Sequence, residues 1–184
     1  RGQNGIDQLI NNAGGQIDGT MRGDNGKDTL INHGTIGNNL NGGNYDDTIQ
    51  NHGTVNNNIL GGTGLDTITN SGTVVNDIEG EADNDTIVNS GNADVILGGT
   101  GDDHITNRGT VTNINGEEDN DTIVNSGTVN QIRGADGDDH ITNNGIVNSY
   151  LIGGDGNDTI INNNTVNNII YGEDGDDTIT INGS

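Results

Sequence analysis

The chain has 184 residues, with five Lys and Arg against 28 Asp and Glu, and a formal net charge of −23. A surface this acidic repels phosphate, which excludes nucleic-acid binding, and the absence of Cys excludes a disulfide framework, a thiolate zinc site and a Cys nucleophile. Only 27% of the residues are apolar, so we expect no conventional globular core. No apolar run approaches the roughly 20 residues needed to cross a bilayer, so we expect no membrane insertion, and no signal-peptide pattern opens the chain.

The chain is an internal repeat. An Asp followed two residues later by Ile or Leu recurs with spacings of 21, 19, 19, 19, 18, 18, 18, 19 and 19 residues. A Gly stands five residues before each of these Asp residues, and a second Gly generally follows six residues after. The ten repeats fill residues 1–184, which predicts a single repeat domain that is a segment of a larger protein. The repeat Asp residues are Asp7, Asp28, Asp47, Asp66, Asp85, Asp103, Asp121, Asp139, Asp158 and Asp177.

Each repeat runs in the same order: an acidic Gly-rich hexapeptide, an aliphatic residue, an Asn, a Gly, and two more aliphatic positions. The segments between glycines are too short for helices, and their β-branched residues favour short strands. The fold predicted is therefore all-β: a parallel β-solenoid (β-roll or β-helix) of about ten coils of 18–19 residues. Coils stacked about 4.8 Å apart form continuous aliphatic ladders. The Asn four residues after each Asp is predicted to form a ladder of hydrogen bonds between coils.

Most of the charge lies in the hexapeptides that end at each repeat Asp. They hold 24 of the 28 carboxylates, the exceptions being Asp18, Asp77, Glu79 and Asp94. Stacking gathers this charge along one edge, where two carboxylates about 5 Å apart repel by roughly 1 kcal/mol in water and more when partly buried. Something must neutralise the edge. Carboxylates with backbone carbonyls freed by Gly turns suit Ca²⁺, and Mg²⁺ fits less well because it retains water.

The hexapeptides and the residues that follow them resemble a known family. The pattern Gly-Gly-x-Gly-x-Asp-x-aliphatic-x is that of the RTX (repeats-in-toxin, haemolysin-type) calcium-binding nonapeptide, which residues 61–69, 98–106 and 153–161 match in full. The resemblance implies a β-roll with several Ca²⁺ ions in one row along one edge, bound by the ten repeat Asp carboxylates. Further carboxylate ligands would be Asp83, Asp119, Asp136, Asp155 and Asp174, with the backbone carbonyls of Gly61, Thr63, Gly98, Thr100 and Gly153.

The chain departs from that family in three ways. The alternate half of each coil carries almost no acid and is similar to the Asn-Gly-Thr coils of β-helical bacterial surface proteins, so we expect one calcium row instead of two. Tyr45, Asp83 and Asp119 replace the fourth-position Gly, and of these Asp adopts left-handed geometry more readily than Tyr. The alternate half also varies in length by one residue, which leaves open a two-sided or a three-sided cross-section.

No group of residues predicts catalysis, and we expect no enzyme activity. His33 and His52 occupy equivalent places in adjacent repeats, where we expect an exposed stacked pair. His104 and His140 lie two repeats apart, too far to share one metal ion. They also interrupt a row of Thr that directly follows the repeat Asp residues, beside a second outward position that alternates among Thr, Val, Ile and Gln.

The sequence favours a calcium-binding structural domain of a large secreted or surface-anchored bacterial protein, an adhesin-like stalk. We expect it to lie outside the cell or on the cell surface and to fold and stiffen in extracellular calcium. Its partners would be calcium ions and, beyond them, a surface glycan or neighbouring repeats of the parent protein. Two alternatives remain open: a solenoid face that binds glycan or ice, and an accessory repeat module of a secreted carbohydrate-active enzyme or toxin.

Overall fold

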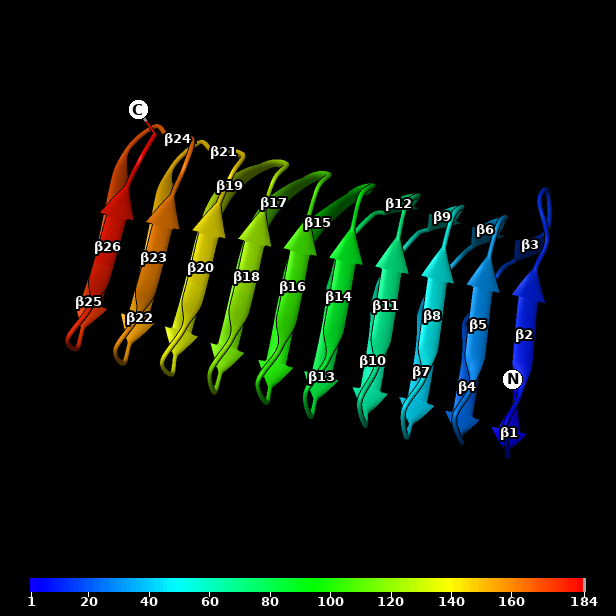
Figure 1. Cartoon of the computed structure of the whole chain (residues 1–184). Helices are drawn as coiled ribbons and strands as arrows, with labels where there is room; N and C mark the ends of the chain where they lie inside the picture. Colours follow the sequence, from blue (N-terminus) through cyan, green and yellow to red (C-terminus); the bar gives the residue numbers. More distant parts are fainter. Residues whose placement is uncertain (184) are drawn as a thin grey trace.

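The computed structural model describes residues 1–183, which form strands, turns and no helix. Figure 1 shows the coils stacked side by side along a rod, with the N- and C-termini at its opposite ends. The prediction of an all-β parallel solenoid is confirmed. Between Asp7 and Asp177 the chain makes nine full turns, and every strand pairing is parallel.

One side of the rod is a ten-stranded parallel sheet with one four-residue strand from each coil. Its register is strict, so that Thr67 lies beside Thr48 on one side and Thr86 on the other. The strands are β2 (Gln8–Asn11), β5 (Thr29–Asn32), β8 (Thr48–Asn51), β11 (Thr67–Asn70), β14 (Thr86–Asn89), β16 (His104–Asn107), β18 (Thr122–Asn125), β20 (His140–Asn143), β23 (Thr159–Asn162) and β26 (Thr178–Ile181).

The other side is a sixteen-stranded sheet made of longer and shorter strands. One row of strands begins with the two-residue β1 (Gln3–Asn4) and continues with the longer β4 (Met21–Asn25), β7 (Leu40–Asn44), β10 (Ile59–Thr63), β13 (Ile78–Ala82), β15 (Asn92–Thr100), β17 (Thr110–Glu118), β19 (Thr128–Asp136), β22 (Tyr150–Asp155) and β25 (Ile169–Asp174). The other two-residue strands are β3 (Gln16–Ile17), β6 (Thr35–Ile36), β9 (Thr54–Val55), β12 (Thr73–Val74), β21 (Ile146–Val147) and β24 (Thr165–Val166).

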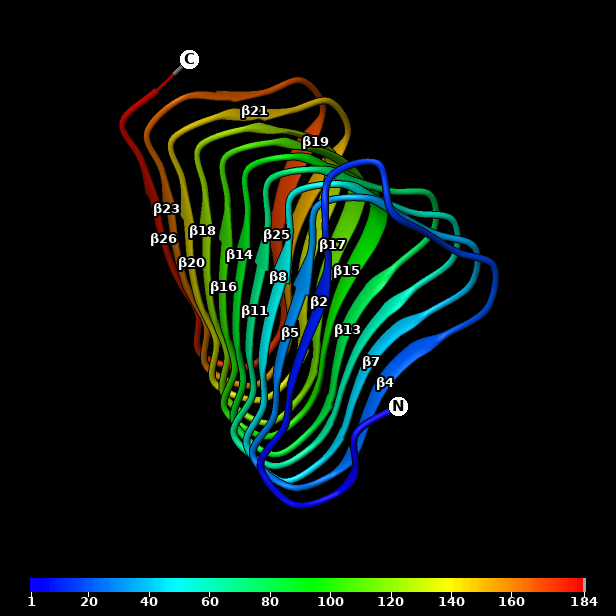
Figure 2. The same ribbon diagram turned by 90° about the vertical axis from the view of Figure 1, so that its right-hand side faces the viewer.

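The cross-section changes along the rod, which answers the question that the sequence left open. In the three central strands β15, β17 and β19 the short and long segments merge into one nine-residue strand, and these coils have two strands each. Elsewhere one further residue in the alternate half interrupts this strand, and the coil has three. Figure 2 shows the coils in end view: a wedge that is narrow at one edge and broad at the other.

The core is a thin set of stacked aliphatic ladders, as the repeat predicts. Each coil from Asp28 to Asp139 contributes one aliphatic residue from the ten-stranded sheet and two from the other, and all but Ala93 are almost completely buried. Ile68, for example, stacks on Ile49 and Ile87 in the neighbouring coils. The buried apolar residues are Met21, Leu30, Ile36, Leu40, Ile49, Val55, Ile59, Ile68, Val74, Ile78, Ile87, Ile96, Ile105, Val111, Ile114, Ile123, Val129, Ile132, Ile141, Val147, Leu151 and Ile160.

A second ladder, of Asn side chains, lies at the end of each strand of the ten-stranded sheet from β2 to β23. The amide nitrogen of Asn70 donates to Oδ1 of Asn89, 2.8 Å away, and Asn89 in turn donates to Asn107 at 2.9 Å. These side chains are fully buried, and the same bond recurs at 2.8–2.9 Å between successive coils from Asn11 to Asn162. The predicted Asn ladder is confirmed, and it satisfies polar groups that would otherwise be buried without partners.

Candidate functional site

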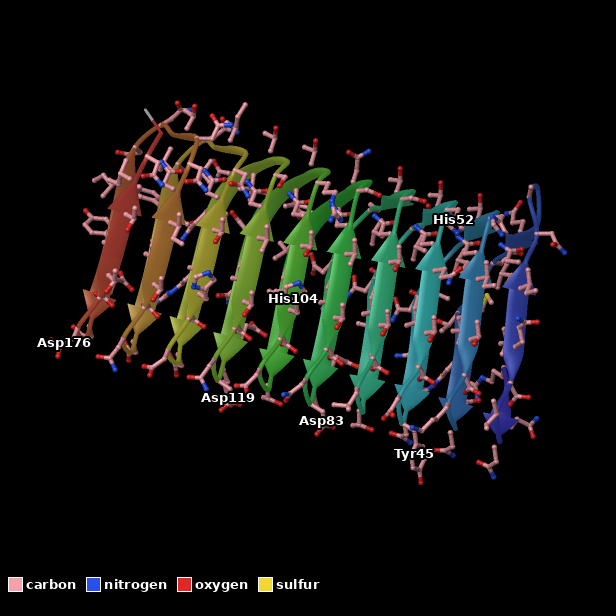
Figure 3. All side chains as sticks on the ribbon, in the orientation of Figure 1. Tyr45, His52, Asp83, His104, Asp119 and Asp176 are labelled. Carbon is pink, nitrogen blue, oxygen red and sulfur yellow. The ribbon has the colours of Figure 1, made fainter. Side chains whose placement is uncertain are left out.

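The acidic hexapeptides form the turns that lead into the ten-stranded sheet, and they lie along one edge of the rod. Figure 3 shows Tyr45, Asp83, Asp119 and Asp176 in a line along this edge, with His52 at the other end of the strands. Only three ion pairs are present among residues 1–183, and each uses one hexapeptide acid: Arg22 with Asp24, Lys27 with Asp46, and Arg133 with Glu173. Most of the negative charge on this edge therefore has no cationic partner in the protein.

The repeat Asp residues form an aspartate ladder that runs the length of the rod. The backbone N–H of each one donates to Oδ1 of the repeat Asp in the next coil; for Asp66 and Asp85 the distance is 2.7 Å. Nine such bonds of 2.6–3.0 Å connect the ten coils. The side chains from Asp28 to Asp158 are at most 2% exposed. The ten residues predicted as calcium ligands are thus brought into one row, with their carboxylates inside the coil.

The second oxygen of these carboxylates has no donor. In nine of the ten residues Oδ2 is buried and finds no hydrogen-bond partner among residues 1–183; the nine are Asp7, Asp28, Asp47, Asp66, Asp85, Asp103, Asp121, Asp139 and Asp158. A buried carboxylate oxygen without a partner destabilises the fold, because it has lost its water and gained nothing in return. The ladder thus leaves one unsatisfied acceptor in almost every coil.

The Gly five residues before each repeat Asp lies directly against this oxygen. A Cβ built on Gly61 would stand 2.6 Å from Oδ2 of Asp66 and 2.6 Å from the carbonyl oxygen of Gly80 in the next coil. The Gly at this position has no positive φ, so close approach, and not turn geometry, requires it. The carbonyl oxygens of Gly61, Gly98 and Gly153, three of the predicted ligands, likewise point at the equivalent Gly of the preceding coil, on the same side as the unsatisfied Oδ2.

Burial and repulsion by neighbouring carboxylates raise the pKa of the ladder carboxyls from Asp47 to Asp158. Burial is the largest cause that raises the pKa, the neighbouring ladder carboxylates add to the rise, and the N–H bond to Oδ1 opposes it. The pKa of Asp47 and Asp103 is raised to about 6, that of Asp66 and Asp139 to about 7, and that of Asp85 and Asp121 to about 8. At neutral pH the ladder therefore favours a proton or a cation at Oδ2.

The turn residues themselves lie outside the ladder and are exposed. Tyr45, Asp83 and Asp119 all have φ between 75° and 77°, so each adopts the left-handed conformation that Gly holds in the other coils. The carboxylates of Asp83 and Asp119 accept the backbone N–H of Gly64 and Gly101 from the preceding coil, both at 3.0 Å. Thr63 and Thr100 are exposed at the adjacent turn position.

Asp136, Asp155 and Asp174 belong to a row of carboxylates that has a fourth member. They stand in register on β19, β22 and β25, and Glu118 on β17 precedes them in the same row. Four successive coils thus place an exposed carboxylate at the third hexapeptide position. The first four coils have Asn4, Asn25, Asn44 and Thr63 there, linked by hydrogen bonds. Glu118 occupies the same hexapeptide position as Asp136, and this shared position could have identified it as a member of the row from the sequence.

The His residues lie where the sequence places them. The rings of His33 and His52 are stacked, with centroids 4.9 Å apart and planes 12° from parallel, and Nδ1 of His52 is 2.7 Å from Oγ of Ser71. Among residues 1–183, no three His, Cys, Asp or Glu side chains form a group that can hold a metal ion. A cation on the acidic edge would therefore need backbone carbonyl oxygens as well as carboxylates.

The part of the chain that the structure describes contains no helix long and apolar enough to cross a membrane. Comparison with family models, with curated proteins and with solved structures gives no match to this chain. The function must therefore be argued from the chemistry of the acidic edge. Its buried carboxylate oxygens, each beside a Gly carbonyl oxygen, are ligand atoms of the type that a hard divalent cation such as Ca²⁺ prefers.

Proposed function

We propose that the chain is a calcium-binding structural rod, a stalk-like segment of a larger extracellular or surface-anchored protein. The observation that carries this proposal is the row of nine buried Oδ2 atoms without a hydrogen-bond donor among residues 1–183, on an edge that holds 24 of the 28 carboxylates of the chain. The similarity of the hexapeptides to RTX nonapeptides supports the choice of Ca²⁺. The lack of a ready-made three-carboxylate group means that carbonyl oxygens would supply part of the coordination.

In this proposal, folding and calcium binding are one process. Oδ1 of each ladder Asp is already engaged by a backbone N–H, so Oδ2 is the oxygen left for a cation. Because Oδ2 is closed off from solvent, an ion would enter as one coil stacks on the next. Without calcium the charged edge opposes stacking, and with calcium the coils stack into a stiff rod. Extracellular calcium modules bind with Kd of about 10⁻⁴–10⁻³ M, which suits such a role outside cells.

The proposal also predicts that calcium and protons compete for the ladder. The pKa of Asp85 and Asp121 is raised to about 8, so at pH 7 these carboxyls carry a proton that an incoming cation must displace. Calcium binding should therefore release protons near neutral pH and should tighten as the pH rises. Magnesium should compete less well, because it holds its own water more firmly.

Calorimetric titration of the whole chain with CaCl₂ tests the proposal. Titrations in two buffers of different ionisation enthalpy give the stoichiometry and the number of protons released. We expect several ions per chain and net proton release at pH 7. The double variant Asp85→Asn/Asp121→Asn should lose bound calcium, whereas Asp18→Asn/Asp94→Asn, which removes two charges away from the hexapeptides, should keep the wild-type stoichiometry. No calcium uptake, or equal losses in the two double variants, would contradict the proposal.

A further inference from the structure

The outward face of the ten-stranded sheet carries no Asp, Glu, Lys or Arg, although the chain has a net charge of −23. Each strand points two residues outward, and eleven of these twenty residues are Thr. We call this surface the threonine face. Its residues are Gln8, Ile10, Thr29, Ile31, Thr48, Gln50, Thr67, Thr69, Thr86, Val88, His104, Thr106, Thr122, Val124, His140, Thr142, Thr159, Ile161, Thr178 and Thr180.

The rest of the surface shows that this neutrality is local. The outward positions of the other sheet include Arg22, Glu79, Asp94 and Arg133, and the hexapeptide turns beside the threonine face are strongly acidic. A face that is exposed only to water can carry charged side chains. Charged residues are depleted from the core of a protein interface, and their absence from the threonine face is typical of such a core. Figure 1 shows the ten strands of this face side by side and evenly spaced along the rod.

We propose that the threonine face is a self-association surface, on which a second copy of this chain packs face to face. A second copy is the occupant that matches the face in two respects. It presents the same spacing of about 4.8 Å between rows of side chains, so methyl and hydroxyl groups can interdigitate along the whole rod. It also brings no charge into the contact. Two sheets that pack face to face interdigitate the side chains of their facing surfaces in the same way.

The area available is sufficient for a dimer. Ten strands of four residues cover a face of about 48 Å by about 13 Å, from the usual strand spacing and rise. Burying that face on two copies removes about 1,200 Å² from solvent, which is at the lower limit for a stable interface. We therefore expect a reversible dimer with a dissociation constant in the micromolar range instead of an obligate one.

Electrostatics selects the orientation of the two copies. A twofold axis parallel to the strands would place both acidic edges on the same side of the dimer. An axis parallel to the rod makes the strands of the two copies antiparallel and places the acidic edges on opposite sides, separated by the width of the face, about 13 Å. That distance exceeds the Debye length of about 8 Å at physiological ionic strength. The second arrangement is favoured, and each coil then faces the same coil of the other copy.

In this arrangement the first outward residue of each strand faces the second outward residue of the same strand in the partner subunit. Thr86 faces Val88 of the partner subunit, and Thr122 faces Val124 of the partner subunit. Each pair combines a hydroxyl-bearing and an aliphatic β-branched side chain. An acidic residue at either position would be buried against an apolar group and close to its own symmetry mate, which is strongly unfavourable.

Sedimentation velocity over a range of protein concentrations tests the proposal, with the β-sheet content of each sample checked by circular dichroism. We expect the mass to rise towards twice the 19.0 kDa of one chain. The variant Thr86→Glu/Thr122→Glu should weaken association at least tenfold. Thr112→Glu/Asn130→Glu adds the same charge at exposed positions of the other sheet and should associate like the wild type. A folded wild-type chain that stays monomeric at the highest concentration, or association that both variants retain, would overturn the proposal.

Crosslinking tests the orientation independently. The chain has no Cys, so T29C carries a single thiol on the second strand of the threonine face, near one end of the rod. With the axis parallel to the rod, the two thiols of a dimer lie close enough for a short bismaleimide to join them. With the axis parallel to the strands they lie about seven coils apart, about 34 Å, and do not react. T112C, on the other sheet, should not crosslink in either case. Failure of T29C to crosslink in a sample that sediments as a dimer would overturn the orientation.

Discussion

The backbone N–H of Asp66 donates to Oδ1 of Asp85 at 2.7 Å, while Oδ2 of Asp85 is buried and has no donor among residues 1–183. One oxygen of the carboxylate thus holds two coils together, and the other opposes their stacking whenever it is charged. The same division is repeated along the rod, and it relates the stability of the fold to whatever occupies Oδ2.

Replacing a ladder Asp by Asn should stabilise the calcium-free rod. In Asp85→Asn the amide oxygen keeps the bond from Asp66, and the new amide nitrogen faces the carbonyl oxygen of Gly98, which lies on the same side of Gly80 as Oδ2. Satisfying this buried position should raise the free energy of unfolding in chelator by about 1–3 kcal/mol. Chemical denaturation measures it. The exposed substitution Asp94→Asn should change it by less than about 0.5 kcal/mol, and a destabilised Asp85→Asn would contradict this account of Oδ2.

The calcium-free rod should lose stability as the pH rises. The ladder pKa values are raised above the value of 3.8 for a free Asp, to about 6 for Asp47 and about 8 for Asp121, so the folded state binds more protons than the unfolded state between these limits. The stabilisation is fully present below about pH 4 and is lost progressively up to about pH 8. Thermal melts in chelator across this range should show a falling melting temperature. A melting temperature that rises from about pH 4 to about pH 8 would contradict the assignment.

The Gly before each ladder Asp should tolerate no side chain. In Gly80→Ala the new Cβ would overlap Oδ2 of Asp85 and the carbonyl oxygen of Gly98, and one of these is backbone that cannot move without shifting a coil. We expect a loss of about 2 kcal/mol or more in the free energy of unfolding. Gly19→Ala is the matched control, because a Cβ at Gly19 has no atom within 4 Å. Equal effects at the two positions would show that general backbone freedom, and not the contact with Asp85, is responsible.

The Asn ladder should contribute to stability without calcium. Asn89 accepts a bond from Asn70, donates one to Asn107 and accepts the N–H of Gly91, and its side chain is fully buried. Asn89→Ala leaves these partners unsatisfied and opens a small cavity, which should lower the free energy of unfolding by about 2–4 kcal/mol, in calcium and in chelator alike. The exposed Asn130→Ala should have little effect. A loss seen only in calcium would mean that this row takes part in ion binding.

Much of this structure follows from period-two alternation within the repeat. Asp66, Ile68 and Asn70 are two residues apart, so a strand that buries Ile68 must also turn the other two inward. The spacing therefore already predicts that the ladder carboxylates point into the coil. The bond to Oδ1 and the reason for Gly61 depend on how one coil sits on the next. Sequence spacing does not specify that offset, and it became visible only in three dimensions.

The cross-section shows a different limit. The sequence records one extra residue in the alternate half of most coils, but whether that residue forms a corner or a bulge depends on the packing of its neighbours. In β15, β17 and β19 the shorter spacing lets Asn92–Thr100 and its two successors run as single strands. In the coils on either side, the extra residue separates a short strand such as Thr73–Val74 from the longer Ile78–Ala82.

The most direct test of the central claim is far-UV circular dichroism of the whole chain during a calcium titration, with magnesium as the control and excess chelator to reverse the change. The account predicts that calcium near millimolar concentration increases the β-sheet signal cooperatively and raises the melting temperature, which magnesium does not reproduce and chelator reverses. A full β-sheet spectrum at pH 7 in chelator, with a melting temperature that calcium does not raise, would contradict it. In that case the Asn and aliphatic ladders would hold the rod together unaided.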